Sequence, residues 1–401
     1  MAPNYYPESG AGAKRVTAIA QHCEKQGWRV KVITLLPHHP HNQIYAGYDG
    51  PSLESQIENG VEVIRIRPRL LSRTNIGLRL WSELIFSIQA ATGVLSHNTD
   101  VILASSPYMF LGPAGLLLSR LKRVKFVWDV RDLTWLYPRA SGKRTYGLDS
   151  LFEQLMLAVA SRSDALTTAT DGLLRYFTRR PKYSISVPNG VSDEVLDSLL
   201  ALPPPSGPPH VLYAGLLGYN HGLGTLIDAA SKCPDAVFTV AGDGPDRKRL
   251  EQLARLRGTR NIVFTGHLAQ DQLREAYLQA TVLVSHVRRH RLFEWTQPAK
   301  LWEYMATARP VVHAGEGEAV AIIKENSIGV TVPPDDPDAL ARAISDLIAS
   351  PDTAGTLACR ARRFVSAHRR RSVLLRELDG LLDALVQPPH ENSVDLSRPF
   401  V

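Results

Sequence analysis

Cysteines are few in this 401-residue sequence, and long apolar runs and a secretory signal are missing from it. The three cysteines, Cys23, Cys233 and Cys359, are odd in number and far apart. Disulfide-stapled extracellular domains use cysteines in denser, even sets, so we expect reduced thiols. No window reaches the ~18 uninterrupted apolar residues of a membrane span. We therefore expect a cytoplasmic protein, either soluble or peripheral on the inner face of the cytoplasmic membrane.

The sequence also lacks a nucleic-acid-binding signature, although its formal net charge is +7. Its basic residues are scattered, and no zinc-finger, single-strand-binding or RNA-recognition pattern accompanies them. We expect no nucleic-acid partner. The run RIRPRLLSRTNIGLRL at 65–80 is more specific, because its arginines alternate with leucine and isoleucine. That mixture is typical of a surface that contacts anionic lipid headgroups.

Strand-like apolar runs alternate with longer amphipathic stretches along the chain, which is the rhythm of parallel α/β sheets. The segment ALPPPSGPPH at 201–210 interrupts this rhythm, because its prolines exclude a helix and a central strand. Single hydrophobic cores stop growing at roughly 250 to 300 residues, so 401 residues favour two domains. The predicted fold class is α/β, with two doubly wound Rossmann-like domains facing across a cleft.

The same patterns predict the domain boundaries. Residues 1–190 form the N-terminal domain, 191–209 a linker and 210–365 the C-terminal domain. A helix at 366–386 packs back on the N-terminal domain, and 387–401 is a frayed tail. Ligands of open parallel sheets bind at the carboxyl ends of the strands, so the cleft is the expected active site.

The most informative stretch is FEWTQPAKLWEYMATARPVV at 293–312. Pro298 suits the start of a helix, and Lys300 and Glu303 then share a face of it. A lysine beside the free amides of a helix N-terminus is unfavourable unless an anion, such as a diphosphate, lies there. A surface ion pair between Lys300 and Glu303 is the plainer alternative, and the spacing alone favours neither.

Glycine-rich turns follow several predicted strands of the C-terminal domain. Three such turns in one domain predict a pocket lined by backbone amides for a nucleotide diphosphate. The glycines and the acidic residue singled out are Gly215, Gly242, Gly244, Gly266, Gly317 and Glu318.

The opening stretch MAPNYYPESGAGAKRV reads as a glycine turn at Gly10 and Gly12 that leads into a helix. A buried strand normally precedes such a turn, and MAPNYY is short and polar for one. We expect either a start at an internal methionine or a truncated sheet edge. A longer chain should then restore a first strand and raise stability.

Taken together, YYPESGAGAKRV, DVRDL, SVPNGV, YAGLLGYNHGL, AGDGPDRKRLE and QPAKLWEYMATARPVV resemble the family 4 retaining glycosyltransferases of GT-B fold, nearest the bacterial surface-polysaccharide branch. The resemblance spans about residues 4–385. It implies a C-terminal domain that binds a nucleotide-sugar donor, an N-terminal domain that presents the acceptor, and no metal or other cofactor.

The resemblance also implies roles for particular residues. Lys300 matches the lysine of the branch's proline-lysine helix start, and Glu303 the glutamate that holds the donor ribose. The expected catalytic residues are Arg131, Asp132, Glu294 and Lys300. The expected donor-binding residues are Gly10, Gly12, Gly215, His221, Gly242, Gly244, Gly266, Lys300, Glu303, Gly317 and Glu318. The expected acceptor-binding residues are Glu8, Ser9, Lys14 and Arg15, although Glu8 could equally cap the helix that follows it.

Several positions depart from the family pattern. The family's first glutamate falls on Trp295, with Glu294 one position away. The arginine and lysine that many members place on the diphosphate fall on Leu216 and His221, which leaves Lys300, backbone amides and Arg288 or Arg289 to offset its charge. These changes bear on which sugar is transferred more than on the fold.

The histidine-rich loop PHHPH contains His38, His39 and His41, which could suggest zinc. The matching loop of the family carries no metal, so we expect none here.

The expected function is transfer of a hexose from a nucleotide-sugar, a UDP-sugar by preference, to a hydroxyl of a saccharide or lipid-linked acceptor in surface-polysaccharide or exopolysaccharide biosynthesis. Two alternatives stay open. One is a sugar-nucleotide epimerase of the same fold, and the other is a catalytically silent nucleotide-sugar-binding subunit.

Overall fold

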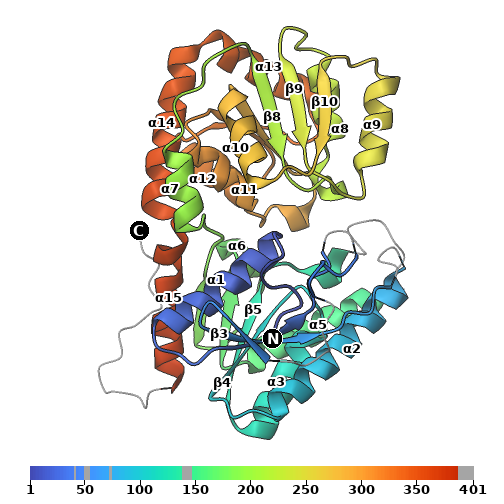
Figure 1. Cartoon of the computed structure of the whole chain (residues 1–401), viewed down its shortest axis with the longest axis vertical. Coiled ribbons are helices and arrows are strands. Elements are labelled where there is room, and N and C mark those ends of the chain that lie inside the picture. The colour runs from blue at the N-terminus through green and yellow to red at the C-terminus, as the bar shows by residue number, and fades with distance from the viewer. Residues whose placement is uncertain (40–41, 49–54, 72–74, 138–146, 387–401) are drawn as a thin grey trace. The chain divides into compact units, whose positions relative to one another are not determined.

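The computed structural model describes residues 1–39, 42–48, 55–71, 75–137 and 147–386 (Figure 1). The chain divides into two compact units. Unit 1 contains Met1–Pro188 and takes up the chain again from Leu374, and unit 2 is Asn189–Val373. His41 of the histidine-rich loop lies outside the described residues.

Unit 1 contains two small sheets. Strands β1 (Lys31–Leu35) and β3 (Val61–Ile66) pair in parallel, and β2 (Ser55–Glu58) pairs antiparallel with β3. The second sheet is parallel, in the order β4 (Val101–Ser105), β5 (Lys125–Val130), β6 (Ala165–Thr168) and β7 (Tyr183–Ser186). The helices are α1 (Ala11–Lys25), α2 (Ile76–Leu95), α3 (Leu111–Lys122), η1 (Thr134–Leu136), α5 (Leu148–Arg162), α6 (Asp171–Tyr176) and α15 (Arg371–Val386).

The first two residues hydrogen-bond to both sheets of unit 1. The Met1 amino group donates to Leu103 O at 2.7 Å, and Met1 O accepts from Ser105 N at 2.9 Å. On the other side, Ala2 N donates to Ile33 O at 3.1 Å. Met1 and Ala2 therefore link β1 to β4.

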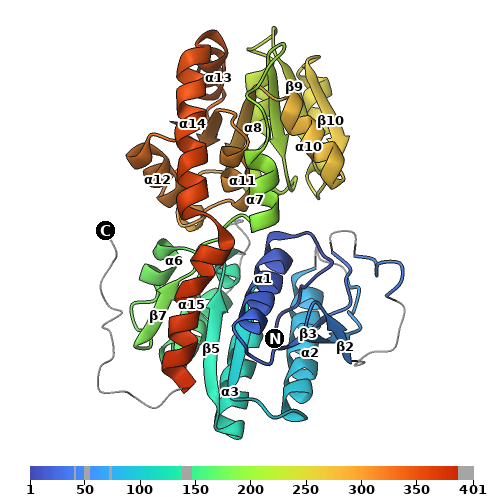
Figure 2. The ribbon, with the colours of Figure 1, turned by 60° about the vertical axis from the view of Figure 1, so that its left-hand side comes forward.

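Helix α15 belongs to the core of unit 1, although it follows unit 2 in the chain. Five of its leucines, at positions 375, 378, 381, 382 and 385, are buried in a cluster with Ile19, Cys23 and Val127. His22 Nε2 on α1 also lies 2.8 Å from Asp379 Oδ1 on α15. Figure 2 shows α15 beside α1, β5 and β7.

A buried ion pair lies at the centre of unit 1. Arg15 on α1 donates through Nη2 to Asp129 Oδ1 at 2.7 Å and through Nε to Asp129 Oδ2 at 3.1 Å. Asp129 also accepts from the hydroxyls of Ser105 and Thr167, and Arg15 donates to Val187 O. These bonds join α1 to β4, β5, β6 and the residue after β7, and they hold the pKa of Asp129 below its usual value despite burial.

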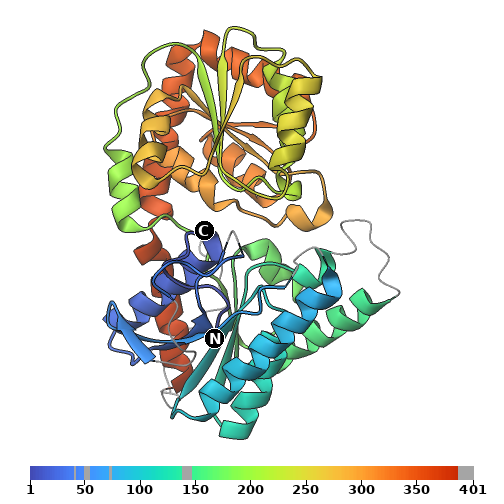
Figure 3. The ribbon, with the colours of Figure 1, turned by 45° about the vertical axis from the view of Figure 1, so that its right-hand side comes forward.

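Unit 2 is a doubly wound, six-stranded sheet in the order β10-β9-β8-β11-β12-β13, with every pair parallel (Figure 3). Its strands are β8 (His210–Ala214), β9 (Val237–Ala241), β10 (Ile262–Gly266), β11 (Val282–His286), β12 (Val311–Ala314) and β13 (Val330–Val332). Its helices are α7 (Asp193–Leu200), η2 (Tyr219–His221), α8 (Gly224–Ala230), α9 (Arg247–Leu256), α10 (Gln270–Gln279), η3 (Arg291–Phe293), α11 (Ala299–Ala306), α12 (Glu318–Asn326), α13 (Pro337–Ala349) and α14 (Pro351–His368).

Helices cover both faces of this sheet. Leucine and isoleucine side chains of α8 and α13 pack on one face, around Tyr213 and Phe238. Residues of α7, α11, α12 and α14 pack on the other, around Trp302 and Tyr304. The predicted α/β class with parallel sheets is confirmed. One predicted detail differs, because α7 lies inside the stretch expected as a linker and packs into the core through Leu196 and Leu199.

Candidate functional site

The carboxyl ends of the strands of unit 2 meet at one edge of its sheet. The strand order reverses between β8 and β11, and ligands of open α/β sheets bind at such a switch point. Two loops there pack backbone against backbone. Gly215 N donates to Ala241 O at 2.8 Å, and Leu217 N donates to Asp243 O at 2.9 Å.

This packing requires glycine. A Cβ at Gly242 (φ +139°) would lie 1.9 Å from Gly215 O, and one at Gly215 (φ +153°) would lie 2.5 Å from Lys300 Nζ. The amides of Gly215, Gly242 and Gly244 all donate within these loops or to the end of β10 at Gly266 O. These three amides therefore have acceptors within the protein, and their expected contact with a donor phosphate stays a prediction. Here glycine allows close loop packing and the approach of a lysine.

Lys300 lies in the first turn of α11 and points at the switch point. Its Nζ donates to Tyr213 Oη at 2.5 Å and lies 4.0 Å from the centroid of the Tyr213 ring. The Tyr213 hydroxyl in turn donates to Leu216 O at 2.9 Å. Burial lowers the pKa of Lys300 from 10.5 to about 7, although Glu303 acts in the opposite direction. Its described hydrogen bond is to a neutral hydroxyl, so the burial of this ammonium is only partly offset.

Neutral imidazoles surround Lys300. Burial, with a smaller contribution from the charge of Lys300, lowers the pKa of His221 to about 3, that of His286 to about 4 and that of His313 to about 3. His286 Nε2 accepts from Asp335 N at 3.3 Å, and His313 Nδ1 lies 3.2 Å from Ser285 Oγ. The site therefore combines one partly buried lysine, whose pKa is near 7, with imidazoles that stay uncharged at neutral pH.

Glu303 lies one turn after Lys300 on the same helix. Burial raises the pKa of both Tyr277 and Tyr304, and the charge of Glu303 acts in the same direction. Tyr304 fixes α11 to the end of β8, because its hydroxyl donates to Ala214 O at 2.6 Å and accepts from Ala214 N at 2.7 Å. Lys300 and Glu303 thus stand on one rigid support.

A second group forms where the loop before α11 meets the start of α12. A Cβ at Gly317 would lie 2.0 Å from Glu294 O, which accepts from Glu318 N at 2.8 Å. The side chain of Gln297 donates to Glu318 Oε1 at 2.6 Å. The structure therefore brings Glu294, Gly317 and Glu318 together through backbone contacts.

Arg288 and Arg289, considered above for the diphosphate, have carboxylate neighbours. Arg288 Nε lies 3.7 Å from Asp335 Oδ1, and its guanidinium covers the Tyr219 ring at 4.4 Å. Arg289 Nε lies 3.1 Å from Glu316 Oε1. Lys300 is consequently the better candidate for contact with an anion.

In unit 1, Arg131 and Asp132 directly follow β5. Arg131 donates to Ser106 O through Nη2 and to Ser106 Oγ through its amide at 2.9 Å. A Cβ at Gly12 would lie 2.0 Å from Arg131 Nη1, so glycine there leaves room for the guanidinium. Burial raises the pKa of Asp132, which accepts from the Tyr137 hydroxyl at 3.2 Å.

Glu8 is 5% exposed and organises the histidine-rich loop. Its Oε1 accepts from the amides of His38 and His39, each at 2.8 Å, and its Oε2 accepts from Asn4 at 2.6 Å. It does not cap α1, for which no side-chain cap is found.

The remaining residues of the opening stretch divide into exposed and buried ones. Ser9 and Lys14 are exposed, and Gly10 is half-buried with an ordinary φ of −63°. Arg15 is engaged in the buried pair with Asp129. The acceptor role expected for these residues stays a prediction, and the buried pair argues against it for Arg15.

Sequence reasoning missed Tyr213, His286, His313 and Gln297 at this site. Tyr213 lies inside a strand, where a tyrosine is usually part of the hydrophobic core. His286 is the last residue of a buried strand, and His313 lies within another. The sequence did offer one signal for these residues, which is a polar side chain near the carboxyl end of an otherwise apolar strand.

Among the residues that the structure describes, no group of three or more His, Cys, Asp or Glu side chains could hold a metal ion. Over the same residues, no helix is both long and apolar enough to span a bilayer.

Comparisons with known proteins agree with this architecture. A family model described as "Glycosyl transferase 4-like domain" matches residues 10–190, and one described as "Glycosyl transferases group 1" matches residues 208–350. Among solved structures, sucrose-phosphate synthase from Thermosynechococcus elongatus aligns with a TM-score of 0.76 at 19% identity over 96% of this chain and 95% of that one. HepE of Anabaena, in complex with UDP-glucose, aligns with a TM-score of 0.70 at 15% identity over 96% and 99%.

The fold is thus GT-B, and the chain belongs to the family 4 glycosyltransferases, which confirms the resemblance. Among curated relatives, it is similar to the putative colanic acid biosynthesis glycosyl transferase WcaI of Escherichia coli (strain K12). The two are 26% identical over 288 residues, which cover 65% of this chain and 69% of the relative.

Proposed function

We propose that this glycosyltransferase transfers a hexose, with retention, from a UDP-sugar to a hydroxyl of a saccharide or lipid-linked saccharide in surface-polysaccharide biosynthesis. The observation that carries the proposal is the partly desolvated Lys300 at the switch point of unit 2. The UDP donor is supported by HepE, whose structure contains UDP-glucose, and the pathway by the name of WcaI. Retention and independence of metals rest on the family resemblance.

The chemistry needs a group that stabilises charge on the leaving diphosphate. As the bond from the anomeric carbon to the diphosphate oxygen breaks, negative charge grows on that oxygen. An ammonium held by Tyr213 in a partly dry site stabilises this charge more than it would in water. The acceptor oxygen then bonds to the anomeric carbon, and its proton passes to the departing phosphate.

Glu303 has the geometry to accept hydrogen bonds from the donor ribose, because it lies one turn beyond Lys300 on a helix fixed by Tyr304. Glu294, Gly317 and Glu318 would border the hexose. Arg131 and Asp132 keep the roles that the resemblance implies, orientation of acceptor and sugar.

A panel of UDP-, GDP- and ADP-sugars tests the proposal. Transfer or slow donor hydrolysis is expected with UDP-sugars. Lys300→Met and Glu303→Gln should each lower donor affinity by about tenfold or more. Lys324→Met and Glu325→Gln are matched controls, because both side chains are exposed on α12. Donor isomerisation would instead identify an epimerase, and tight binding without turnover a silent subunit.

The exposed apolar side chains of unit 1 support a peripheral membrane contact. Helices α2, α3 and α5 lie side by side, since α3 packs on both others (Figure 1). Together they expose Leu78, Trp81, Ile88, Leu95, Leu117, Leu121, Leu148, Leu151 and Leu155, each at least 40% accessible. We call this surface the α2–α3–α5 face.

Cations border the α2–α3–α5 face. Arg67 and Arg69 precede α2, Arg120 and Arg123 lie near the end of α3, and Arg162 ends α5, all of them exposed. Apolar side chains with bordering arginines suit the interface of an anionic bilayer.

Co-sedimentation with vesicles tests this contact. The protein should bind vesicles that contain phosphatidylglycerol and should bind neutral ones weakly. Leu117→Glu with Leu121→Glu should abolish binding, whereas Leu256→Glu on α9, 76% exposed, should not. Equal binding by both variants would remove the assignment.

A further inference from the structure

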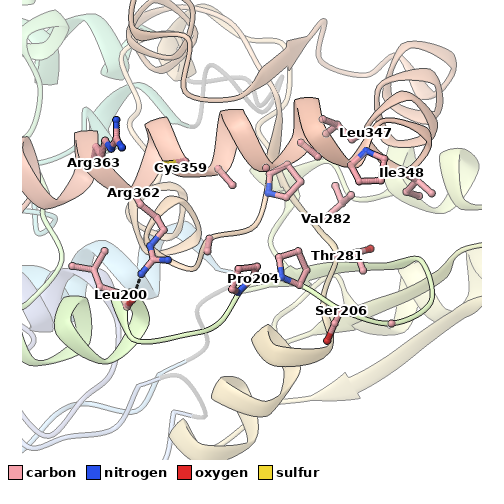
Figure 4. A pocket seen from close by; sticks show the side chains of 18 of the residues that line it. Leu200, Pro204, Ser206, Thr281, Val282, Leu347, Ile348, Cys359, Arg362 and Arg363 are labelled. Atoms are coloured by element: carbon pink, nitrogen blue, oxygen red, sulfur yellow. Dashed lines mark hydrogen bonds between the residues drawn. The ribbon is translucent and has the colours of Figure 1, made fainter.

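A groove of about 990 Å³ lies at the opposite edge of the unit 2 sheet from Lys300. Thr281 and Val282 at the start of β11, and Pro310 before β12, lie at its floor. The proline-rich segment 204–209 forms one wall and α14 the other (Figure 4). Because these are the amino ends of the strands, the groove is separate from the candidate donor site.

The groove is apolar along most of its length. On α14, Ala354, Gly355, Ala358 and Cys359 face it, and Leu347 and Ile348 of α13 close one end. From Pro351 to Arg362 the helix advances about 16 Å. No aspartate or glutamate of the described part of the chain lines the groove.

The other end of the groove is cationic. Arg362 and Arg363 line it, and Arg362 donates to Leu200 O, a neutral partner. Arg309 is buried next to the proline-rich wall, because it donates to Pro203 O at 2.8 Å. It also donates to Leu278 O at 3.2 Å, and its described acceptors are all carbonyl oxygens. The charge of Arg362 and the burial of Arg309 together lower the pKa of Arg309 to about 10. Among the residues that the structure describes, no carboxylate lines this end to match the positive charge of these arginines.

Gly355 keeps the middle of the groove open at a cost to the helix. It lies inside α14, where glycine is less favourable than alanine by about 1 kcal/mol. A Cβ at this position would meet no atom within 4 Å, and no left-handed φ occurs there. The packing of unit 2 therefore does not require glycine at position 355.

We propose that this groove binds a single-chain amphiphile, an apolar chain that carries a carboxylate or a phosphate at one end. The chain lies along Ala354, Gly355 and Ala358, and the anion lies at Arg362 and Arg363. The proposal is independent of the glycosyl-transfer reaction, because it uses no residue of the donor site.

Cys359 provides the readout, because it is exposed in the groove whereas Cys23 and Cys233 are buried. The rate of its modification by N-ethylmaleimide is measured by mass spectrometry on the full chain, with decanoate, decyl phosphate or neutral decanol added below micelle formation. We expect saturable protection by the anions, with half-saturation at about tenfold higher concentration for decanol. If only decanoate or only decyl phosphate protects Cys359, the result identifies the headgroup that the groove binds. Calorimetric titration gives a second, independent measure of binding.

Matched variants decide whether the protection is specific. Gly355→Leu should fill the groove and abolish protection, whereas Gly380→Leu on α15, also in open space, should keep it. Arg363→Glu, on an exposed side chain, should weaken both anions about tenfold and leave decanol unchanged, and it remains a test if Gly355→Leu fails to fold. The proposal fails if no amphiphile protects Cys359, or if protection persists equally in Gly355→Leu and Arg363→Glu.

Discussion

Lys300→Met should raise the stability of the ligand-free protein while it removes donor binding. The pKa of Lys300 falls from 10.5 to about 7 on folding. A shift of this size corresponds to on the order of 5 kcal/mol against the charged form. Because the residue is only partly shielded from solvent, and methionine loses the bond to Tyr213, we expect a net gain of about 1 to 2 kcal/mol at pH 6. That gain raises the Tm by roughly 2–8 °C.

The pH dependence has a definite sign. Between pH 7 and 10.5 the unfolded chain binds a proton at Lys300 that the folded chain has lost, so this lysine makes stability rise with pH over that window. Below pH 7 both states are protonated and its contribution is constant. The advantage of Lys300→Met should therefore be largest at pH 6 and should fade towards pH 10, as measured by thermal unfolding of both proteins.

Donor binding should have the opposite dependence. A bound diphosphate needs the charged form of Lys300, so affinity for the nucleotide-sugar should fall by up to roughly tenfold per pH unit above pH 7. Calorimetric titration in buffers of different ionisation enthalpy should show uptake of about half a proton at pH 7. Two results together would refute this account of Lys300. One is an affinity for the nucleotide-sugar that is constant from pH 6 to 9, and the other is a Lys300→Met variant that is no more stable than wild type.

Three further predictions concern the supports of the fold. Asp129→Asn should cost about 3–5 kcal/mol in urea unfolding, because it leaves a buried guanidinium without its carboxylate. Asp197→Asn removes an exposed pair and should cost far less than Asp129→Asn, so equal losses would contradict the assignment. Gly242→Ala should abolish nucleotide binding, whereas Gly258→Ala, also at positive φ but in open space, should only reduce stability. Leu381→Ala should cost about 2–5 kcal/mol, and hydrogen exchange should increase in unit 1 alone; increased exchange in the strands of unit 2 would disprove this.

Local sequence patterns identified most of the strands and the helix that carries Lys300. Apolar runs mark strands wherever both faces are buried, as in β11 and β12. Strands β2 and β7 give no such signal, because their residues are exposed or half-buried and leave no apolar run. Pro298 marked the start of α11 because proline fits the turn that opens a helix.

The partners of particular side chains could not be predicted, because they come from distant parts of the chain. The spacing around Lys300 gave no sign of Tyr213, 87 positions away, whose hydroxyl and ring hold the ammonium. Arg15 was expected to bind the acceptor, and nothing near it in the sequence pointed to Asp129, 114 positions on, as its partner. Likewise, a glycine turn looks the same whether its amides face a ligand or, as at Gly215, another loop.

Unit 1 is built from two separate stretches of the chain, and this affects how it folds during synthesis on the ribosome. The leucines of α15 that complete its core emerge only after all of unit 2 has been made. Until then, Ile19 and Cys23 of α1 have no partner from that helix, while unit 2 already has its entire sequence. The order of folding should therefore reverse the order of the sequence, with the second unit finished first, and a ribosome stalled before α15 would hold a chain whose earliest segment is the part exposed to aggregation.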